Sequence, residues 1–356
     1  MAEKINWKFI LNTIKSEKCI LLLGPELPVA TNKSSITDAM CDFLSVDDNE
    51  NISSYYEKDG FFLFPNGMAK TFVYYEIKDF YSQKFEEKIY EKIAQIPFHL
   101  IISLNPDLLL SEAMKKLNIP HEFEFYKKKQ KPKEVNSPSM NAPLVYNMFG
   151  SIEEEESLIL THDDLFDFLL TTLGSHSLPA KLQKALREAD NFIFLGFNFE
   201  RWYMQLLIRL LNPPEEKYTF IRYALNTQID SYVKSFYIEQ FRIKFIESES
   251  TDFIDTLFRM CKNNNILRKA TDMPVSRRAK IEQFIENDDL PNALAGLKDY
   301  FMDTDDEDMI MMQTSRYNRL KRKLNKGVID ANHVEVEINK IKDVLIQLAK
   351  QLEDKS

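Results

Sequence analysis

The sequence predicts an α/β protein: a Rossmann-like parallel sheet with flanking helices, followed by a small all-α helical bundle. Over about the first 260 residues, short β-rich apolar runs alternate with helical periods, which is typical of a parallel sheet covered by helices. Beyond about residue 274 the strand-like runs stop and only helical periods follow. The chain, at 356 residues, also exceeds the usual size of one hydrophobic core. We therefore expect two domains, an α/β domain over residues 1–270 and a helical domain over residues 274–356.

Six apolar runs of the first domain are predicted strands. They cover residues 20–23, 100–103, 144–149, 191–197, 218–225 and 242–246. Helices are expected at about 36–44, 106–117, 162–173, 202–210 and 252–261, with one more between the last two strands. The order of the strands in the sheet does not follow from the sequence. Because open α/β sheets bind ligands beyond the carboxyl ends of their strands, the loops after Leu23, Ser103, Phe149 and Phe197 are where a site is expected.

The tail reads as helices alone. Apolar spacing predicts helices around 281–285 and 290–301, then a longer helix to about Asn325 that Gly327 ends. The last helix carries apolar residues at alternating spacings of four and three, namely Val334, Ile338, Ile341, Leu345, Leu348 and Leu352. We favour packing of this stripe inside the bundle over a coiled-coil seam, because the repeat lasts less than three heptads.

Composition and charge argue against several classes of protein. A net charge of −9 opposes general affinity for nucleic acid, and the basic run at 127–133 is expected to be a solvated loop. No apolar run approaches the roughly 20 residues that cross a bilayer, and no secretion signal is evident, so we expect a cytoplasmic protein. Cys19, Cys41 and Cys261 are odd in number and scattered, which favours reduced thiols over disulfides or a zinc site.

Five short segments of the first domain, mostly at strand ends, carry a family resemblance. They read ILLLGPELPVA at 20–30, LNPD at 104–107, YNMFGS at 146–151, LTHDDL at 160–165 and LGFNF at 195–199. In this order they resemble the glycine-rich loop, Asn-Tyr-Asp turn, Leu-His-Gly-Ser, Leu-Thr-x-Asp-Asp-Tyr and Gly-Tyr-Ser-Phe elements of the sirtuin-like family found in bacterial anti-phage effectors. Several members of that family cleave NAD. The resemblance spans roughly residues 8–262, and the absence of a Cys-x-x-Cys zinc ribbon makes protein deacetylation unexpected.

The resemblance implies positions for a site. The implied cofactor pocket consists of Gly24, Glu26, Thr161, Gly196 and Asn198. The implied catalytic residues are Asn105 and Asp107, with Phe149 where the family has a catalytic His. Asn-Pro-Asp is also a good strand-to-helix turn with a capping side chain, so we favour a structural, vestigial role of Asn105 and Asp107 over retained catalysis.

Three residues depart from the chemistry that the family uses. Pro25 removes a backbone donor, and Glu26 places a carboxylate where a pyrophosphate would rest on backbone N–H groups. Phe149 cannot transfer a proton, and loss of general acid/base assistance typically costs about 10² to 10⁴ in rate. We therefore expect no cofactor, with NAD as the cofactor only if the protein is nevertheless an enzyme.

One cluster of polar residues resembles a metal site. His162, Asp163 and Asp164 are adjacent, but they lie at a predicted helix start, where carboxylates interact favourably with the helix dipole. We favour capping over metal binding, and no metal site is expected.

Three segments of the tail resemble a bacterial effector-associated domain, a small helical bundle that recruits partners through like-with-like contacts. They are NDDLPNAL at 287–294, SRYNRL at 315–320 and KGVI at 326–329, within a resemblance that covers about 274–353. It implies a partner effector protein that carries a matching domain. The basic residues Arg316, Arg319 and Arg322, close in sequence to the acidic stretch 303–308, are candidate partner-binding residues.

Two hypotheses of function follow. In the first, the chain is a catalytically degenerate sirtuin-like protein that forms a homo-oligomer and acts as an adaptor in a bacterial defence or conflict system. In the second, it is an NAD hydrolase that assembly activates. The altered glycine loop and Phe149 favour the first, and a sensor of some nucleotide other than NAD is a third interpretation.

Overall fold

The computed structural model describes residues 5–27, 35–83, 88–128, 130–173, 178–211, 221–225, 229–268, 281, 284–285, 289–301, 306–325 and 331–350. The chain divides into two compact units, Met1–Ala270 and Thr271–Ser356. Among the described residues, no helix is long and apolar enough to cross a membrane.

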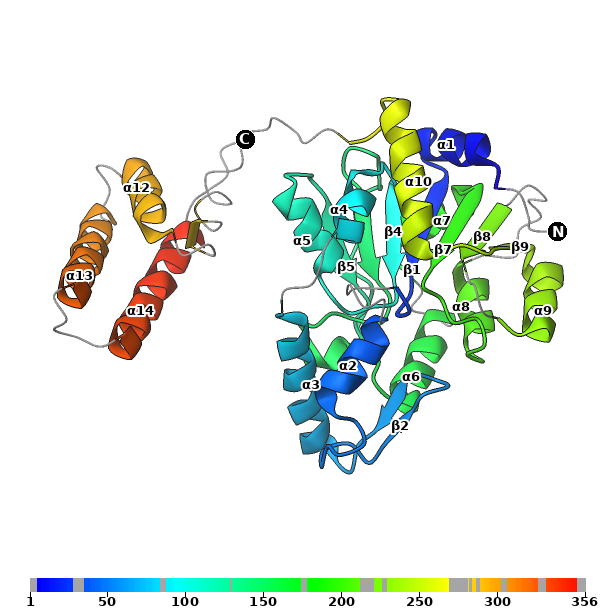
Figure 1. Cartoon of the computed structure of the whole chain (residues 1–356), viewed down its shortest axis with the longest axis horizontal. Coiled ribbons are helices and arrows are strands. Elements are labelled where there is room, and N and C mark those ends of the chain that lie inside the picture. The colour runs from blue at the N-terminus through cyan, green and yellow to red at the C-terminus, as the bar shows by residue number, and fades with distance from the viewer. Residues whose placement is uncertain are drawn as a thin grey trace. The chain divides into compact units, whose positions relative to one another are not determined.

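A seven-stranded parallel sheet organises the first unit (Figure 1). Its strands, in spatial order, are β5 (Glu122–Phe125), β6 (Leu144–Asn147), β4 (Leu100–Ser103), β1 (Cys19–Leu23), β7 (Asn191–Leu195), β8 (Ile221–Leu225) and β9 (Ile243–Ile246). Because β1 pairs with β4 on one side and with β7 on the other, the strand order reverses at β1. The region beyond the carboxyl end of β1 is therefore the topological switch point, where open α/β sheets bind ligands.

Both faces of the sheet are buried. Along β1, Cys19, Leu21 and Leu23 belong to one hydrophobic core, whereas Ile20 and Leu22 belong to the other. This two-sided burial explains why the central strands are continuous apolar runs rather than alternating ones.

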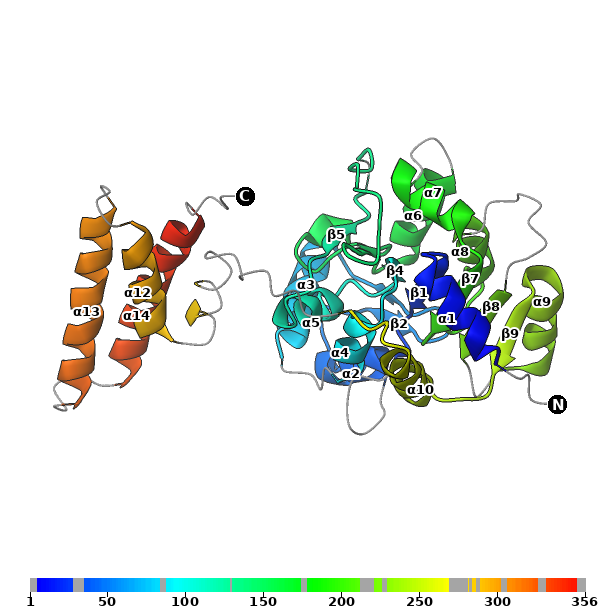
Figure 2. The same ribbon diagram turned by 90° about the horizontal axis from the view of Figure 1, so that it is seen from above.

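Helices cover each face (Figures 1 and 2). The first core includes residues of α1 (Trp7–Lys15), α2 (Ile36–Leu44), α3 (Gly67–Tyr81), α4 (Lys88–Gln95), α5 (Leu109–Lys116) and α10 (Ser250–Asn263). The second includes residues of α6 (His162–Leu173), α7 (Ala180–Glu188), α8 (Met204–Leu211) and α9 (Ser231–Phe241). The antiparallel hairpin of β2 (Ser54–Tyr56) and β3 (Phe61–Leu63) is a separate two-stranded sheet that contacts the segment before α6, where the Phe62 N–H donates to the Leu160 carbonyl at 2.8 Å.

The predicted fold class is confirmed, with local differences. Strand β5 was not predicted, because the other strands were recognised as apolar runs. Its Glu-Phe-Glu-Phe sequence instead alternates charged and aromatic residues, as a half-exposed edge strand does. The predicted strand 191–197 ends at Leu195, and the predicted helix 202–210 begins only at Met204. Trp202 therefore precedes α8, and it is 41% exposed. Residues 218–220 lie outside the described residues.

The second unit contains α12 (Leu290–Tyr300), α13 (Glu307–Asn325) and α14 (Ala331–Lys350). In α14, Ile341, Leu345 and Leu348 are at most 2% exposed and Ile338 is partly buried, so the predicted stripe packs within the bundle. The side chain of Val334, and residues 303–305, Gly327 and Leu352, lie outside the described part of the chain.

Candidate functional site

Loops from four parallel strands meet at the carboxyl edge of the sheet and line a small cavity. Pro25 follows β1, Asn105 follows β4, Phe149 follows β6, and Arg201 follows β7. The cavity holds about 70 Å³. Ligand pockets usually hold about 300–1,000 Å³, so this cavity encloses far less space than such pockets do.

The backbone donors of the loop after β1 already have partners. The Gly24 N–H donates to the Leu195 carbonyl at 2.8 Å and the Glu26 N–H to the Gly196 carbonyl at 2.9 Å. The Leu27 N–H donates to the Gly24 carbonyl at 3.3 Å. Pro25 has no N–H, so each remaining donor from Gly24 to Leu27 is used within the protein.

The first turn of α2 is closed in the same way. The Ile36 N–H donates to the Leu27 carbonyl at 3.3 Å and the Thr37 N–H to the Pro25 carbonyl at 3.4 Å. The Asp38 N–H donates to the Ser35 hydroxyl at 3.0 Å in a capping box. Helix N-termini bind phosphates through such N–H groups, but here the preceding loop occupies them.

The two glycines at this edge serve close backbone packing. A Cβ on Gly24 would lie 2.2 Å from the Gly196 carbonyl oxygen. Gly196 has φ +68°, and a Cβ on it would lie 2.4 Å from the Leu27 nitrogen. Gly24 and Gly196 therefore allow the ends of β1 and β7 to come into direct backbone contact. This close packing explains why both residues are glycine, and it requires no ligand.

Glu26 does not project into open solvent. Its Oε1 accepts a hydrogen bond from Arg201 Nη2 at 2.8 Å, and Arg201 is only 5% exposed. Burial raises the pKa of Glu26, and the opposing effects of Arg201 and Ser35 do not fully compensate. Sequence reasoning missed Arg201, which lies between Glu200 and Trp202 in the short link between the predicted strand 191–197 and the predicted helix 202–210.

Asn105 and Asp107 occupy different environments. Asn105 is buried, lines the cavity, and places its side-chain Nδ2 3.5 Å from the Gly24 carbonyl oxygen. Asp107 Oδ1 accepts from the Leu109 N–H at 3.0 Å at the start of α5, while its buried Oδ2 has no partner among the described residues. Burial raises the pKa of Asp107 to about 7.

Phe149 forms part of an aromatic wall. It is 8% exposed, meets Phe168 edge to face with ring centroids 5.6 Å apart, and lies 6.3 Å from the Tyr203 ring. The residue at the family's His position thus packs in the core and lines the cavity without any proton to transfer.

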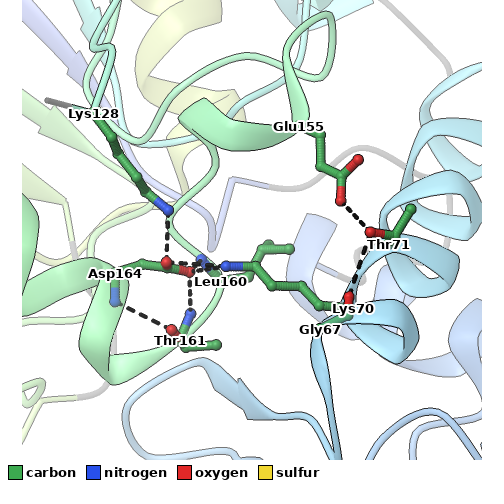
Figure 3. Close-up of polar contacts among 8 residues, drawn as sticks. All are labelled: Gly67, Lys70, Thr71, Lys128, Glu155, Leu160, Thr161 and Asp164. Carbon is green, nitrogen blue, oxygen red and sulfur yellow. Dashed lines mark hydrogen bonds and ion pairs between the residues drawn. The ribbon is translucent and has the colours of Figure 1, made fainter. Parts of the chain in front are cut away.

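Thr161 and Asn198, both assigned to the pocket by resemblance, shape turns. Thr161 Oγ1 accepts from the Asp164 N–H at 3.1 Å, and Asp164 Oδ2 accepts from the Thr161 N–H at 3.1 Å, which is a reciprocal cap at the start of α6 (Figure 3). Asn198 Oδ1 accepts from the Glu200 N–H at 3.0 Å, and its carbonyl accepts from the Arg201 N–H at 3.4 Å. Asn198 thus helps to place Arg201.

Asp164 is the centre of an ion-pair cluster (Figure 3). Lys70 Nζ and Lys128 Nζ lie 2.8 Å and 2.6 Å from its carboxylate oxygens. Burial alone would raise the pKa of Asp164, but hydrogen bonds from Lys128 and Lys70 lower it overall. Neighbouring His162 Nε2 lies 3.0 Å from Asp59 Oδ2, and within the described ranges no three His, Cys, Asp or Glu side chains gather as metal ligands would.

The described residues of the basic run at 127–133 form a loop, as expected, but Lys127 and Lys128 are not simply solvated. Lys128 pairs with Asp164, Lys127 Nζ lies 2.5 Å from Glu154 Oε2, and Lys133 Nζ lies 2.8 Å from Glu124 Oε2. Carboxylates from separate elements therefore neutralise these three lysines.

In the second unit, the three candidate arginines differ. Arg316 Nη2 on α13 lies 2.6 Å from Glu337 Oε2 on α14, whereas Arg319 and Arg322 are exposed. Hydrogen bonds from Lys340 and Arg316 lower the pKa of Glu337 to about 2. Arg316 thus links two helices of the bundle, and Arg319 and Arg322 remain available to a partner.

Comparison with known families agrees with both resemblances. The SIR2-like domain model matches residues 99–246, and the effector-associated domain 11 model matches residues 276–353. No curated protein matches the chain. The SIR2-like match runs from β4 to β9 and leaves out β1 with its altered glycine loop. The chain therefore carries a SIR2-like domain followed by a C-terminal effector-associated domain 11.

Proposed function

We propose that this chain is a catalytically degenerate SIR2-like protein that serves as an adaptor in a bacterial defence or conflict system. Its SIR2-like domain is fused to an effector-associated domain, a combination that suggests a component of such a system. In this proposal the tail recruits an effector protein with a matching domain, and the α/β unit supports assembly.

One observation carries the proposal of lost catalysis. The backbone donors that would hold a pyrophosphate, in the loop from Gly24 to Leu27 and in the first turn of α2, are bound to carbonyls and the Ser35 hydroxyl of the protein itself. Phe149 and the small cavity remove the proton carrier and the space as well. NAD therefore does not fit the residues present.

The direct test is NAD consumption and NAD binding by the purified full-length protein, with an active SIR2 family member as positive control. We expect no turnover and no binding at micromolar NAD. The assay is repeated with the tail-bearing partner present, because an enzyme gated by assembly is silent alone. Turnover that Asn105→Ala abolishes would overturn the proposal.

The alternative, an NAD hydrolase activated by assembly, has one observation in its favour. Asn105 remains at the cavity, and Asp107, two residues later, has a pKa of about 7, so it can gain and lose a proton near neutral pH. This alternative predicts turnover only with the partner, and sensitivity to both Asn105→Ala and Asp107→Asn.

Recruitment through the tail is tested by charge reversal on α13. The exposed Arg319 and Arg322, changed together to Glu, are expected to weaken partner capture on the order of tenfold, with a smaller effect at high salt. Lys298→Glu, on the exposed surface of α12, is the matched control that leaves capture unchanged. Circular dichroism checks that each bundle remains helical. Equal capture by all three proteins would transfer the binding role to the α/β unit.

A further inference from the structure

Arg201 is a buried cation whose capacity to bind an anion is only partly used. It is 5% exposed, and its Nη2 contacts the carboxylate of Glu26 at 2.8 Å. Its Nη1 donates to the Tyr203 hydroxyl at 3.3 Å. Its Nε is buried and has no hydrogen-bond partner in the part of the chain that the structure describes. A guanidinium presents five N–H donors in one plane, in a geometry that suits a carboxylate.

The surroundings of Arg201 hold the guanidinium in place. Gly60, in the β2–β3 hairpin, has φ +78°, and a Cβ there would lie 2.9 Å from Arg201 Nη1. The Tyr203 hydroxyl, which accepts from Arg201, donates to the Asp59 carbonyl at 3.1 Å. The hairpin and the loop after β7 therefore form a fixed socket for the cation.

Glu26 is the replaceable member of the ion pair. Its side chain is 32% exposed, against 5% for the side chain of Arg201. The negative charge of Asp38 lies near enough to oppose that of Glu26. An external carboxylate that enters from solvent would therefore exchange with Glu26 while Arg201 stays in its socket.

The space beside Arg201 favours an apolar body on that external anion. The cavity walls include Met40, Phe61, Ile77 and Phe149, and the free volume is about 70 Å³. This volume suits a chain of about three carbons. The head group would take the place of the Glu26 carboxylate on Arg201, which lines the cavity although Glu26 does not. Mostly apolar walls disfavour inorganic phosphate, because Thr37, Asn105 and Tyr203 are the polar side chains beside Arg201 there and replace little of its hydration.

We propose that this crevice binds a short-chain monocarboxylate, whose carboxylate replaces that of Glu26 on Arg201 and whose alkyl chain fills the cavity. The ligand competes with a resident side chain, so the wild-type site binds it weakly and Glu26 sets the affinity. The proposal does not depend on the adaptor role of the tail.

The first test measures thermal stabilisation and calorimetric binding of the full-length protein with butyrate. Butyramide, the uncharged analogue, and inorganic phosphate are the controls. We expect saturable stabilisation by butyrate alone. Glu26→Gln removes the competing charge and should lower the dissociation constant of butyrate at least tenfold, because Arg201 is then left without its carboxylate.

The second test changes the apolar wall without touching the ion pair. Met40 is partly buried and lines the cavity, so Met40→Ala should shift the preferred ligand from butyrate to hexanoate. If Glu26→Gln does not fold, this shift in chain length decides the question with the wild type as reference. The proposal is wrong if butyrate and butyramide act alike in every protein that folds, or if phosphate matches butyrate, or if Met40→Ala leaves chain-length preference unchanged.

Discussion

The loops after β1 and β4 lie side by side at the same sheet edge, yet they differ in how many of their polar groups are already hydrogen-bonded. In the β1 loop, from Gly24 to Leu27, every backbone donor is bound within the protein. In the β4 loop, Asn105 still lines the cavity and Asp107 keeps a buried carboxyl oxygen without a partner in the described structure. The half of the crevice that would hold a pyrophosphate is closed, whereas the loop after β4 still places the Asn105 amide at the cavity and, behind its lining, a buried carboxyl oxygen of Asp107 without a described partner.

If NAD chemistry is lost, as we propose, this difference distinguishes a change in a side chain from a change in the backbone hydrogen bonds. Phe149, where the resemblance implies a His, is a difference in one side chain and leaves the backbone arrangement intact. Closure of the β1 loop instead involves backbone hydrogen bonds to Leu195 and Gly196, together with those of α2, so it is distributed over the frame. A single side chain does not reverse a change of the second kind.

The largest expected effect concerns Asp107 in the loop after β4, and it is an effect on stability as a function of pH. The folded-state pKa of Asp107, about 7, lies above its usual value of 3.8, so the folded protein holds this proton more tightly than the unfolded chain does. Stability from this group is complete below about pH 4 and is lost as the pH rises towards 7. At about 1.4 kcal/mol per pKa unit, the loss reaches about 4 kcal/mol. Asp107→Asn should abolish this decline, as measured by urea unfolding at several pH values.

A carboxylate with the opposite shift is the control for Asp107. The pKa of Asp164 is lowered, so its contribution is present above pH 3.8 and is lost as the pH falls through the lowered value. Asp164→Asn should therefore remove an acid-side loss of stability and leave the decline between pH 4 and 7 intact. An Asp107→Asn protein with the wild-type pH profile would show that the carboxyl is ionised and solvated.

The next effect tests closure of the β1 loop. Gly196→Ala forces a Cβ to 2.4 Å from the Leu27 nitrogen at φ +68°, and should destabilise the protein by about 3 kcal/mol. Gly67 begins α3, and a Cβ added there would meet no described atom beyond its chain neighbours within 4 Å, so Gly67→Ala should change stability by less than about 1 kcal/mol. Chemical unfolding of both variants measures the contrast. Equal stability of the two would mean that the ends of β1 and β7 can separate.

The strands that support this site could be predicted from the sequence more completely than its hydrogen bonds and ion pairs. Buried strands such as 100–103 are evident because two-sided burial requires apolar residues at every position. The presence of Phe149 at the site could also be predicted, because a motif shows which residue type stands at each of its positions. The acceptor of the Glu26 N–H could not be predicted, because a backbone donor has the same chemistry in every sequence. Arg201 was missed because its ion pair joins positions 175 residues apart.

The smallest expected effect is the sharpest test of the comparison. Glu26→Gly with Phe149→His restores the family residues at two positions, but it restores no backbone donor, because the N–H of residue 26 still donates to Gly196 and Pro25 still has none. The cavity remains far smaller than a dinucleotide. We therefore expect NAD affinity to stay below calorimetric detection, as in the wild type, while an active SIR2 family member binds under the same conditions. Micromolar binding by the double variant would show that the Glu26 side chain alone keeps the loop closed, and the distinction between the two halves of the crevice would then fail. Adding Asn105→Ala to that variant would identify whether such binding uses the half after β4.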